Sequence, residues 1–170
     1  GSAHVPLLIM PPQGRSLPQN ISVEAPTDLV DLYPTILAMA GLSSPVSVSG
    51  RNLLEPVPMD RIFFGNSLNR NFCVMEEKVK LVYSAVGDHV LLFDLNTDPM
   101  EQHNLAEDPA WQERQAKLWK LLLEHTAQYT PEALDEKGQF LTYEAPHFPG
   151  DVPGRWFGFH YHDYSVDTFH

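Results

Sequence analysis

Four short β-type runs follow one another in the middle of the chain, and they constrain its fold more than any other feature. They are rich in apolar, β-branched and aromatic residues, and they read RIFFGNS, FCVMEE, KVKLVYS and HVLLFDL within residues 61–95. The turn-forming sequence AVGD separates the last two runs and favours a hairpin. Runs joined by such short connections predict a four-stranded antiparallel sheet.

A long helical pattern follows the sheet over residues 108–129. Asp108 suits the N-cap, and Pro109 suits the first helical position because no N–H is needed there. Large side chains recur at helical spacing, namely Trp111, Leu118, Leu122, His125 and Tyr129. We therefore expect one face of this helix to lie on the sheet. On that face, His125 is expected to be an interface histidine rather than a metal ligand.

Two further elements are expected ahead of the sheet. The apolar run VPLLIMPP at residues 5–12 is typical of a strand buried on both faces, as in a parallel sheet. The sequence DLYPTILAMAGL predicts a short helix, with Asp31 as its N-cap and Gly41 beyond its last turn.

The link between the sheet and the long helix carries acids and asparagines that suggest a cation loop. Asp94, Asn96 and Asp98 fit the first three ligand positions of a calcium loop. Pro99 stands where the loop needs a glycine, and Leu105 stands where it needs a bidentate glutamate. We therefore interpret this link as a strand end, a turn and a capped helix start.

Composition narrows the possible functions. The 170 residues include 11 Lys and Arg against 22 Asp and Glu, so the net charge of −11 disfavours nucleic acid as a partner. The sequence contains no apolar run near the roughly 20 residues that span a bilayer. The single cysteine, Cys73, excludes an internal disulfide framework and is expected to be buried.

The sequence contains no established catalytic motif, such as a GxSxG elbow, a phosphate loop or HExxH. We assign no catalytic residue and no metal ligand; His160 and His162 would form only half of a metal site. Asn66, Asn69 and Arg70 fall between the first two expected strands, where a loop could present hydrogen-bond donors to an anion. These three are the candidate substrate-binding residues.

Five phrases occur in a fixed order along residues 4–129, namely VPLLIMPP, DLVDLYPTILAMAGL, GRNLL, KVKLVYS and LLFDLNTDPMEQHNLAEDP. In sequence and spacing they resemble the C-terminal third of sulfatases. These enzymes belong with phosphoglycerol transferases and phosphonate hydrolases in the alkaline-phosphatase superfamily. The tail from Thr130 matches no phrase of the family.

The resemblance implies an α+β fold, in which a four-stranded antiparallel sheet packed by a long C-terminal helix follows a strand and a helix of a larger α/β sulfatase domain. Residues 5–58 would end the large domain, and residues 59–129 would form the sheet subdomain. Residues 130–170 would be an aromatic-rich extension. Residues 1–4 are expected to be a tag scar and boundary.

The resemblance further implies a parent enzyme that hydrolyses sulfate esters with a divalent cation, Ca²⁺ or Mg²⁺. The cation ligands and the nucleophile would belong to an N-terminal catalytic domain of the same chain, so this piece alone should be inactive and serve as scaffold and cleft wall. The substrate would be a small-molecule or glycan sulfate or phosphate ester. The alternatives are the same part of a phosphoglycerol transferase or a phosphonate or phosphate ester hydrolase, or else a non-catalytic glycan- or protein-binding module.

Three smaller expectations complete this interpretation. The family favours an extracytoplasmic location, periplasmic or secreted. The strand at residues 5–10 would expose unpaired backbone groups in the isolated piece, so self-association is expected. The resemblance also makes four residues of the link structural, as turn-holding and capping groups, namely Asp94, Asp98, Glu101 and Asn104.

Overall fold

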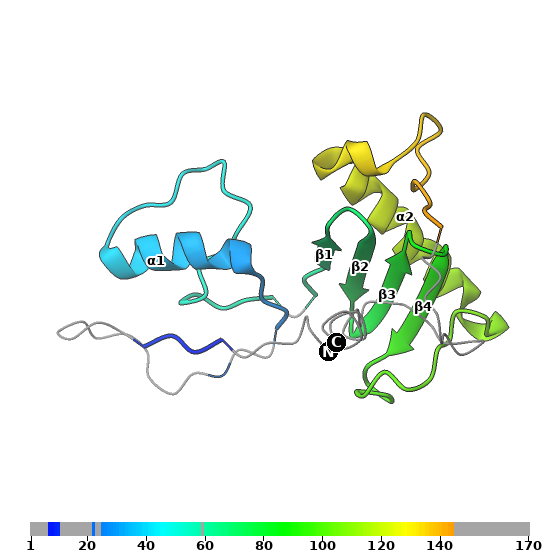
Figure 1. The fold of residues 1–170 in the computed structure, drawn as a ribbon. Helices are drawn as coiled ribbons and strands as arrows, with labels where there is room; N and C mark the ends of the chain where they lie inside the picture. The colour runs from blue at the N-terminus through cyan, green and yellow to red at the C-terminus, as the bar shows by residue number, and fades with distance from the viewer. Residues whose placement is uncertain (1–6, 11–21, 23–24, 59, 145–170) are drawn as a thin grey trace, which may run out of the picture. The chain divides into compact units, whose positions relative to one another are not determined.

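The computed structural model describes residues 7–10, 22, 25–58 and 60–144 (Figure 1). The expectations for residues 1–4, for the extension beyond residue 144 and for His160 and His162 therefore lie outside the described residues. Contacts divide the chain into two compact units, one within Val5–Phe63 and one within Phe64–His170. The expected domain limits stay a prediction.

The second unit is built on a four-stranded sheet. Its strands are β1 (Phe63–Ser67), β2 (Asn71–Glu76), β3 (Val79–Ser84) and β4 (His89–Asp94), in the spatial order β1-β2-β3-β4 (Figure 1). β2 pairs antiparallel with β3, and β3 pairs antiparallel with β4. The four expected strands and their hairpin order are confirmed.

The central strands β2 and β3 are buried over several consecutive positions and form the apolar core of this sheet. Leu81 and Leu92 face one another across β3 and β4, and both are fully buried. Cys73, on the neighbouring strand, is also fully buried, as expected. Residues two apart lie on the same face of a strand, so the apolar runs produce buried rows across the sheet.

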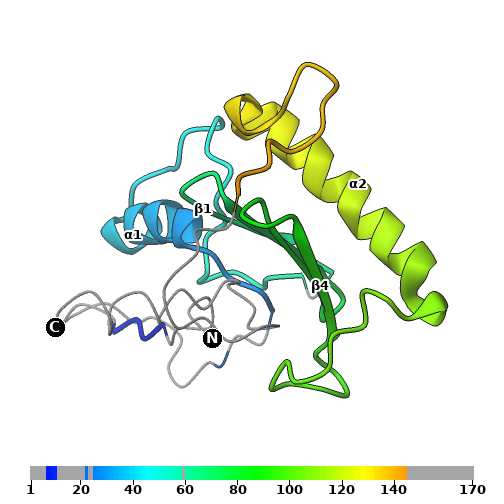
Figure 2. The same ribbon diagram turned by 45° about the vertical axis from the view of Figure 1, so that its right-hand side comes forward.

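The long helix α2 (Gln112–Tyr129) lies along one face of the sheet (Figure 2). A single 3-10 turn, η2 (Pro109–Trp111), precedes it, and the Asp108 carboxylate caps this turn by accepting a hydrogen bond from the Ala110 N–H at 2.9 Å. The expected helix start is thus confirmed. η3 (Pro131–Ala133) is a second 3-10 turn, beyond the end of α2.

The line of buried side chains along α2 differs from the expected one at the C-terminal end of the helix. Leu118 and Leu122 are buried as predicted, and Thr126 continues the line in steps of four residues. Tyr129 was expected on this face but is 57% exposed, and it is the last residue of the helix. His125 is an interface residue as expected, since its ring stacks on Phe64 with 3.8 Å between the ring centroids.

The first unit contains α1 (Leu32–Ala40), which begins after the short 3-10 turn η1 (Leu29–Asp31). Asp31 is the N-cap residue of α1, and Gly41 ends the helix with a φ of 75°. Both helix boundaries are confirmed. The positive φ explains the glycine, because a left-handed backbone is favourable mainly for glycine.

The side chain of Asp31 is fully buried and connects separate segments of this unit. Its carboxylate accepts hydrogen bonds from the backbone N–H groups of Asp28 and Arg51, both at 2.8 Å, and from Nη2 of Arg61 at 3.0 Å. Burial alone would raise the pKa of Asp31, but the bonds from Arg61, Arg51 and Asp28 outweigh it and lower the pKa. The carboxylate is therefore a charged structural centre.

Two further contacts explain why the phrases DLYPT and GRNLL occur together. The Thr35 hydroxyl donates to the Asp31 carbonyl at 2.6 Å and accepts from the Leu53 N–H at 2.9 Å. Gly50 passes so close to the preceding segment that an added Cβ would lie 1.9 Å from the Val30 carbonyl oxygen. Only glycine fits this approach.

The strand expected over residues 5–10 is not formed in the described residues 7–10, which have no regular secondary structure. Leu8 is 86% exposed and Met10 is 77% exposed. A strand needs a hydrogen-bonded neighbour, and none of the described segments pairs with this one. The self-association expected from this strand stays a prediction.

Candidate functional site

The acidic link after β4 is a series of closed turns. The Asp94 carboxylate accepts hydrogen bonds from the Asn96 N–H and from the Thr97 hydroxyl, each at 3.0 Å. The hydrogen bond from the Asn96 backbone is the main reason that the pKa of Asp94 is lowered. Asp98 accepts from the N–H groups of residues 102 and 103, both at 2.8 Å. The expected turn-holding role of both aspartates is confirmed.

Asn104 covers the outer edge of β4. Its side-chain oxygen accepts from the Leu92 N–H at 2.9 Å, and its side-chain nitrogen donates to the Val90 carbonyl at 3.3 Å. The Leu105 N–H then donates to the Leu92 carbonyl at 2.8 Å. The capping role implied for Asn104 is therefore confirmed, and it serves a strand edge.

Glu101 has a different role from the one expected. Its carboxylate forms an ion pair with Lys80 of β3 at 2.7 Å, and the two side chains are only 22% and 14% exposed. Lys80 is therefore partly buried and paired rather than open to solvent. The partners are 21 positions apart in the sequence, so local spacing gave no sign of the pair.

The described residues contain no group of three or more His, Cys, Asp or Glu side chains that could hold a metal ion. In the same part of the chain, no helix is long and apolar enough to span a membrane. The carboxylates of Asp94 and Asp98 accept the hydrogen bonds that close the turns of the link.

The three candidate substrate-binding residues lie together at the tip of the β1–β2 hairpin. The Asn69 N–H donates to the Asn66 side-chain oxygen at 3.0 Å, and the Asn66 amide donates back to the Asn69 side-chain oxygen at 2.6 Å. Leu68 and Asn69 have φ angles of 54° and 53°, as in the type I′ turn of a tight hairpin. Leucine rarely adopts this conformation, and here its side chain is 91% exposed.

Two residues far along the chain complete this tip, and sequence spacing did not reveal them. The Asn69 amide donates to the Glu132 carboxylate of η3 at 2.9 Å. The Arg70 guanidinium lies over the Tyr143 ring, 4.6 Å from its centroid. We call Asn66, Asn69, Arg70, Glu132 and Tyr143 the hairpin-tip cluster.

The cluster offers chemically different groups on one exposed surface. Within the described part of the chain, the Arg70 guanidinium donates no hydrogen bond, so its donors can face an anionic group from solvent. The Glu132 carboxylate would repel an anion placed beside it but can accept from a hydroxyl group. Such a surface suits a ligand that carries both an anionic group and hydroxyl groups.

Comparisons with known proteins find sulfatases among the relatives of this chain. No protein-family model matches the chain. Arylsulfatase K of Bos taurus is 34% identical over an alignment of 124 residues, which covers 62% of this chain and 22% of that protein. The uncharacterized sulfatase YidJ of Escherichia coli strain K12 is 30% identical over 132 residues, which covers 71% of this chain and 26% of that protein.

Among solved structures, BT1596, described as a 2-O GAG sulfatase, has a similar fold. The TM-score is 0.53 at 21% sequence identity, and the match covers 71% of this chain and 30% of that one. This likeness concerns the fold, including the antiparallel sheet and its C-terminal helix. The chain spans only 22% to 26% of the length of the two sequence relatives.

Proposed function

We propose that this chain, a C-terminal portion of the sulfatase family by its relatives and its fold, is a subdomain of an enzyme that hydrolyses sulfate esters. The observation that carries the proposal is the 34% identity with arylsulfatase K along 62% of the chain. In this proposal the chain acts as scaffold and as a wall of the active-site cleft. The turns and edge contacts made by the link residues support a structural role.

The chemical step in this proposal belongs to an N-terminal catalytic domain of the same chain. Cleavage of a sulfate ester requires a nucleophile that attacks sulfur and a divalent cation, Ca²⁺ or Mg²⁺, that stabilises the developing charge. Relatives several times longer than this match support the idea that these groups lie outside the 170 residues. The proposal keeps the extracytoplasmic location that the resemblance implies.

The hairpin-tip cluster is the proposed contribution of this chain to substrate binding. Arg70 supplies a guanidinium group that can donate two parallel hydrogen bonds to a sulfate oxygen pair. Asn66 and Asn69 hold the tip in its tight turn and present polar groups beside it. The cluster would thus contact a charged, hydroxyl-bearing ester while the catalytic domain holds the reacting group.

The first experiment separates the scaffold proposal from its alternatives. The 170-residue chain and the longer protein that contains it are each assayed with an aryl sulfate in the presence of Ca²⁺ or Mg²⁺. We expect hydrolysis by the longer protein alone. Turnover by the 170 residues would contradict the scaffold role. A longer protein that prefers phosphate or phosphonate esters, or a chain that only binds glycans tightly, would replace the sulfatase proposal with one of the alternatives.

The second experiment tests the cluster in the longer protein. We expect Arg70→Ala to raise KM for a sulfated substrate by roughly ten-fold or more, because a hydrogen bond to a charged group contributes about 1.5–3 kcal/mol. The matched control is Lys137→Ala, which removes another exposed cation from the same unit. Unchanged KM in Arg70→Ala, or an equal change in the control, would remove Arg70 from substrate binding.

A further inference from the structure

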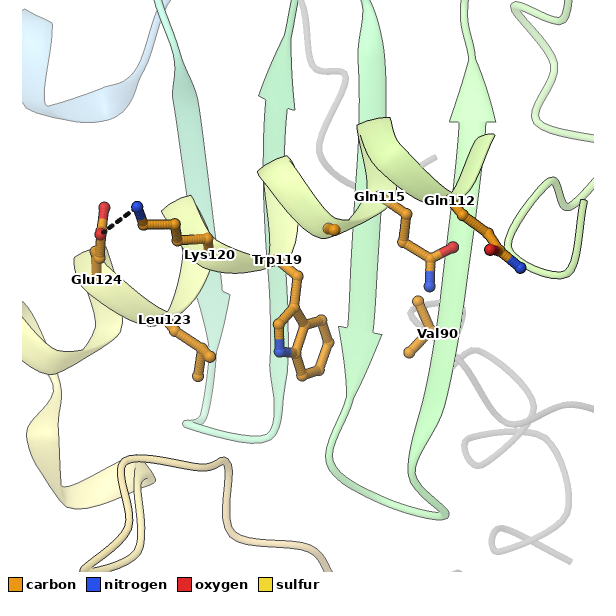
Figure 3. A pocket seen from close by; sticks show the side chains of 8 residues that line it. Val90, Gln112, Gln115, Trp119, Lys120, Leu123 and Glu124 are labelled. Carbon is orange, nitrogen blue, oxygen red and sulfur yellow. Dashed lines mark ion pairs between the residues drawn. The ribbon is translucent and has the colours of Figure 1, made fainter. Parts of the chain in front are cut away.

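A shallow apolar groove lies between α2 and the outer strand of the sheet (Figure 3). Its volume is about 650 Å³, and its walls include Val90 of β4 and Ala116, Trp119 and Leu123 of α2. Figure 3 shows Trp119 and Leu123 projecting from the same side of the helix, with Val90 nearby. Exposed apolar surface of this kind is characteristic of a place where another segment docks.

The groove is the uncovered end of an aromatic layer. Phe72, Tyr83 and Val90 are paired across β2, β3 and β4 and so lie in one row on the face that α2 covers. Phe140 packs on the first two of these residues, with ring centroids 4.6 and 4.7 Å away. Trp119 meets the Tyr83 ring edge-on at 4.9 Å. The groove begins where this row reaches Val90.

A buried polar atom in the same groove has no partner. The side-chain oxygen of Gln115, a groove residue, is buried and accepts no hydrogen bond from any of the described residues. A buried acceptor without a donor is unfavourable by about 1–3 kcal/mol. The oxygen is closed to solvent in this conformation, so an occupant of the groove could bond to it only after the Gln115 side chain rotates toward the groove.

The part of the chain that the structure describes ends beside the groove. The Tyr143 N–H donates to the Ala85 carbonyl at 2.7 Å, and the Gly87 N–H donates to the Tyr143 carbonyl at 2.9 Å. These bonds fix Tyr143 against the turn that leads directly into β4, the strand that contributes Val90. Phe140, three residues earlier, is 5.5 Å from the Trp119 ring. The last described residues therefore lie near the open end of the aromatic layer.

Residues 145–170 have the composition that the groove requires. They contain seven aromatic residues, namely Phe148, Trp156, Phe157, Phe159, Tyr161, Tyr164 and Phe169. Tyrosine, tryptophan and histidine side chains combine an apolar ring with a hydrogen-bond donor. Reach is not limiting, since a segment of this length can extend roughly 80 Å while the α2 wall of the groove is roughly 20 Å long.

We propose that the groove is the docking site of the chain's own segment 145–170, with an aromatic side chain of that segment seated between Trp119 and Val90. The segment then completes the layer that Phe140 begins. The inference concerns this chain alone and does not depend on the proposed enzymatic function.

The experiment uses Trp119 as a reporter. Trp111→Phe and Trp156→Phe are introduced in every protein, which leaves Trp119 as the single tryptophan. Acrylamide quenching is compared between the full chain and a chain that ends at Glu144. We expect stronger quenching in the shortened chain and recovery when a synthetic peptide of residues 145–170 that also carries Trp156→Phe is added. Hydrogen exchange of β3 amides shows that both proteins keep their sheet.

Equal quenching in the two chains would overturn the proposal. Protection of Trp119 that depends on protein concentration would also overturn it, because a second copy would then be the occupant. A peptide that binds without protecting Trp119 would place the segment elsewhere and equally reject the groove.

A groove variant of the full chain provides a test that does not involve truncation. Ala116→Arg fills the groove with a charged side chain, whereas Ala127→Arg makes the same change at an exposed position of α2 outside the groove. We expect trypsin to cleave after Arg155 several-fold faster in Ala116→Arg than in the parent chain, with the control unchanged. Equal cleavage rates in all three proteins would reject docking in the groove.

Discussion

Replacing Asp31 by alanine should unfold the first unit or nearly so. The side chain is fully buried, and its removal leaves the Arg61 guanidinium without its carboxylate and two backbone N–H groups without their acceptor. Breaking a buried ion pair by removing one partner destabilises a protein by about 3–5 kcal/mol. Because the Arg61 side chain keeps 12% exposure and can partly reach water, we expect a loss near the lower end of this range.

Hydrogen exchange is the suitable assay, since all three tryptophans lie after residue 110 and cannot report on this unit. A loss of about 3 kcal/mol lowers the protection of the α1 amides by roughly a hundred-fold. Where the total stability of the unit is smaller than the loss, these amides exchange without protection. The amides of α2 should be unchanged. The control is Asp60→Ala, an exposed aspartate of the same unit.

The same carboxylate predicts a dependence on pH. Folding lowers the pKa of Asp31, so the unfolded chain binds its proton more tightly than the folded one. The contribution of Asp31 to stability is therefore fully present above the ordinary aspartate pKa and is lost as the pH falls through the folded value. Two results would refute the assignment of Asp31 as the centre of this unit. One is hydrogen-exchange protection of α1 that persists in Asp31→Ala, and the other is protection that does not change as the pH is lowered.

Two further substitutions test separate contacts. Gly50→Ala would place its Cβ against the Val30 carbonyl, so we expect a loss of about 1–3 kcal/mol in α1 exchange, and an unchanged exchange pattern would contradict the close approach. Asn104→Ala removes the acceptor of the Leu92 N–H, so the urea midpoint followed by tryptophan fluorescence should fall by the equivalent of about 1 kcal/mol. An unchanged midpoint would mean that water replaces the asparagine without penalty.

The elements that follow from local chemistry could be predicted from the sequence. The strands were evident because apolar runs and turn residues act over a few positions, and the ends of α1 were evident because Asp31 and Gly41 stand at its two boundaries. The strand expected at residues 5–10 depended on a neighbouring strand, which an apolar run by itself cannot specify. Contacts between residues far apart in the sequence were missed for the same reason.

The same distinction between local and long-range contacts applies to the residues of the candidate site. Asn66, Asn69 and Arg70 could be selected because they fall in a short connection between two strands. Glu132 and Tyr143 could not, since each lies more than 60 positions from the residue it contacts and only the fold brings them together. Their part in substrate binding, like that of the first three, stays a prediction.

The cover that Asn104 and Leu105 form over β4 has a consequence for assembly. The Leu92 N–H and carbonyl and the Val90 carbonyl already have partners there, so a strand from another molecule could not add beyond β4 without displacing the link. Growth of the sheet is thereby confined to the β1 side. A sheet that can extend at one edge alone pairs with a single other copy, whereas a fibre requires a free edge on each side of the sheet.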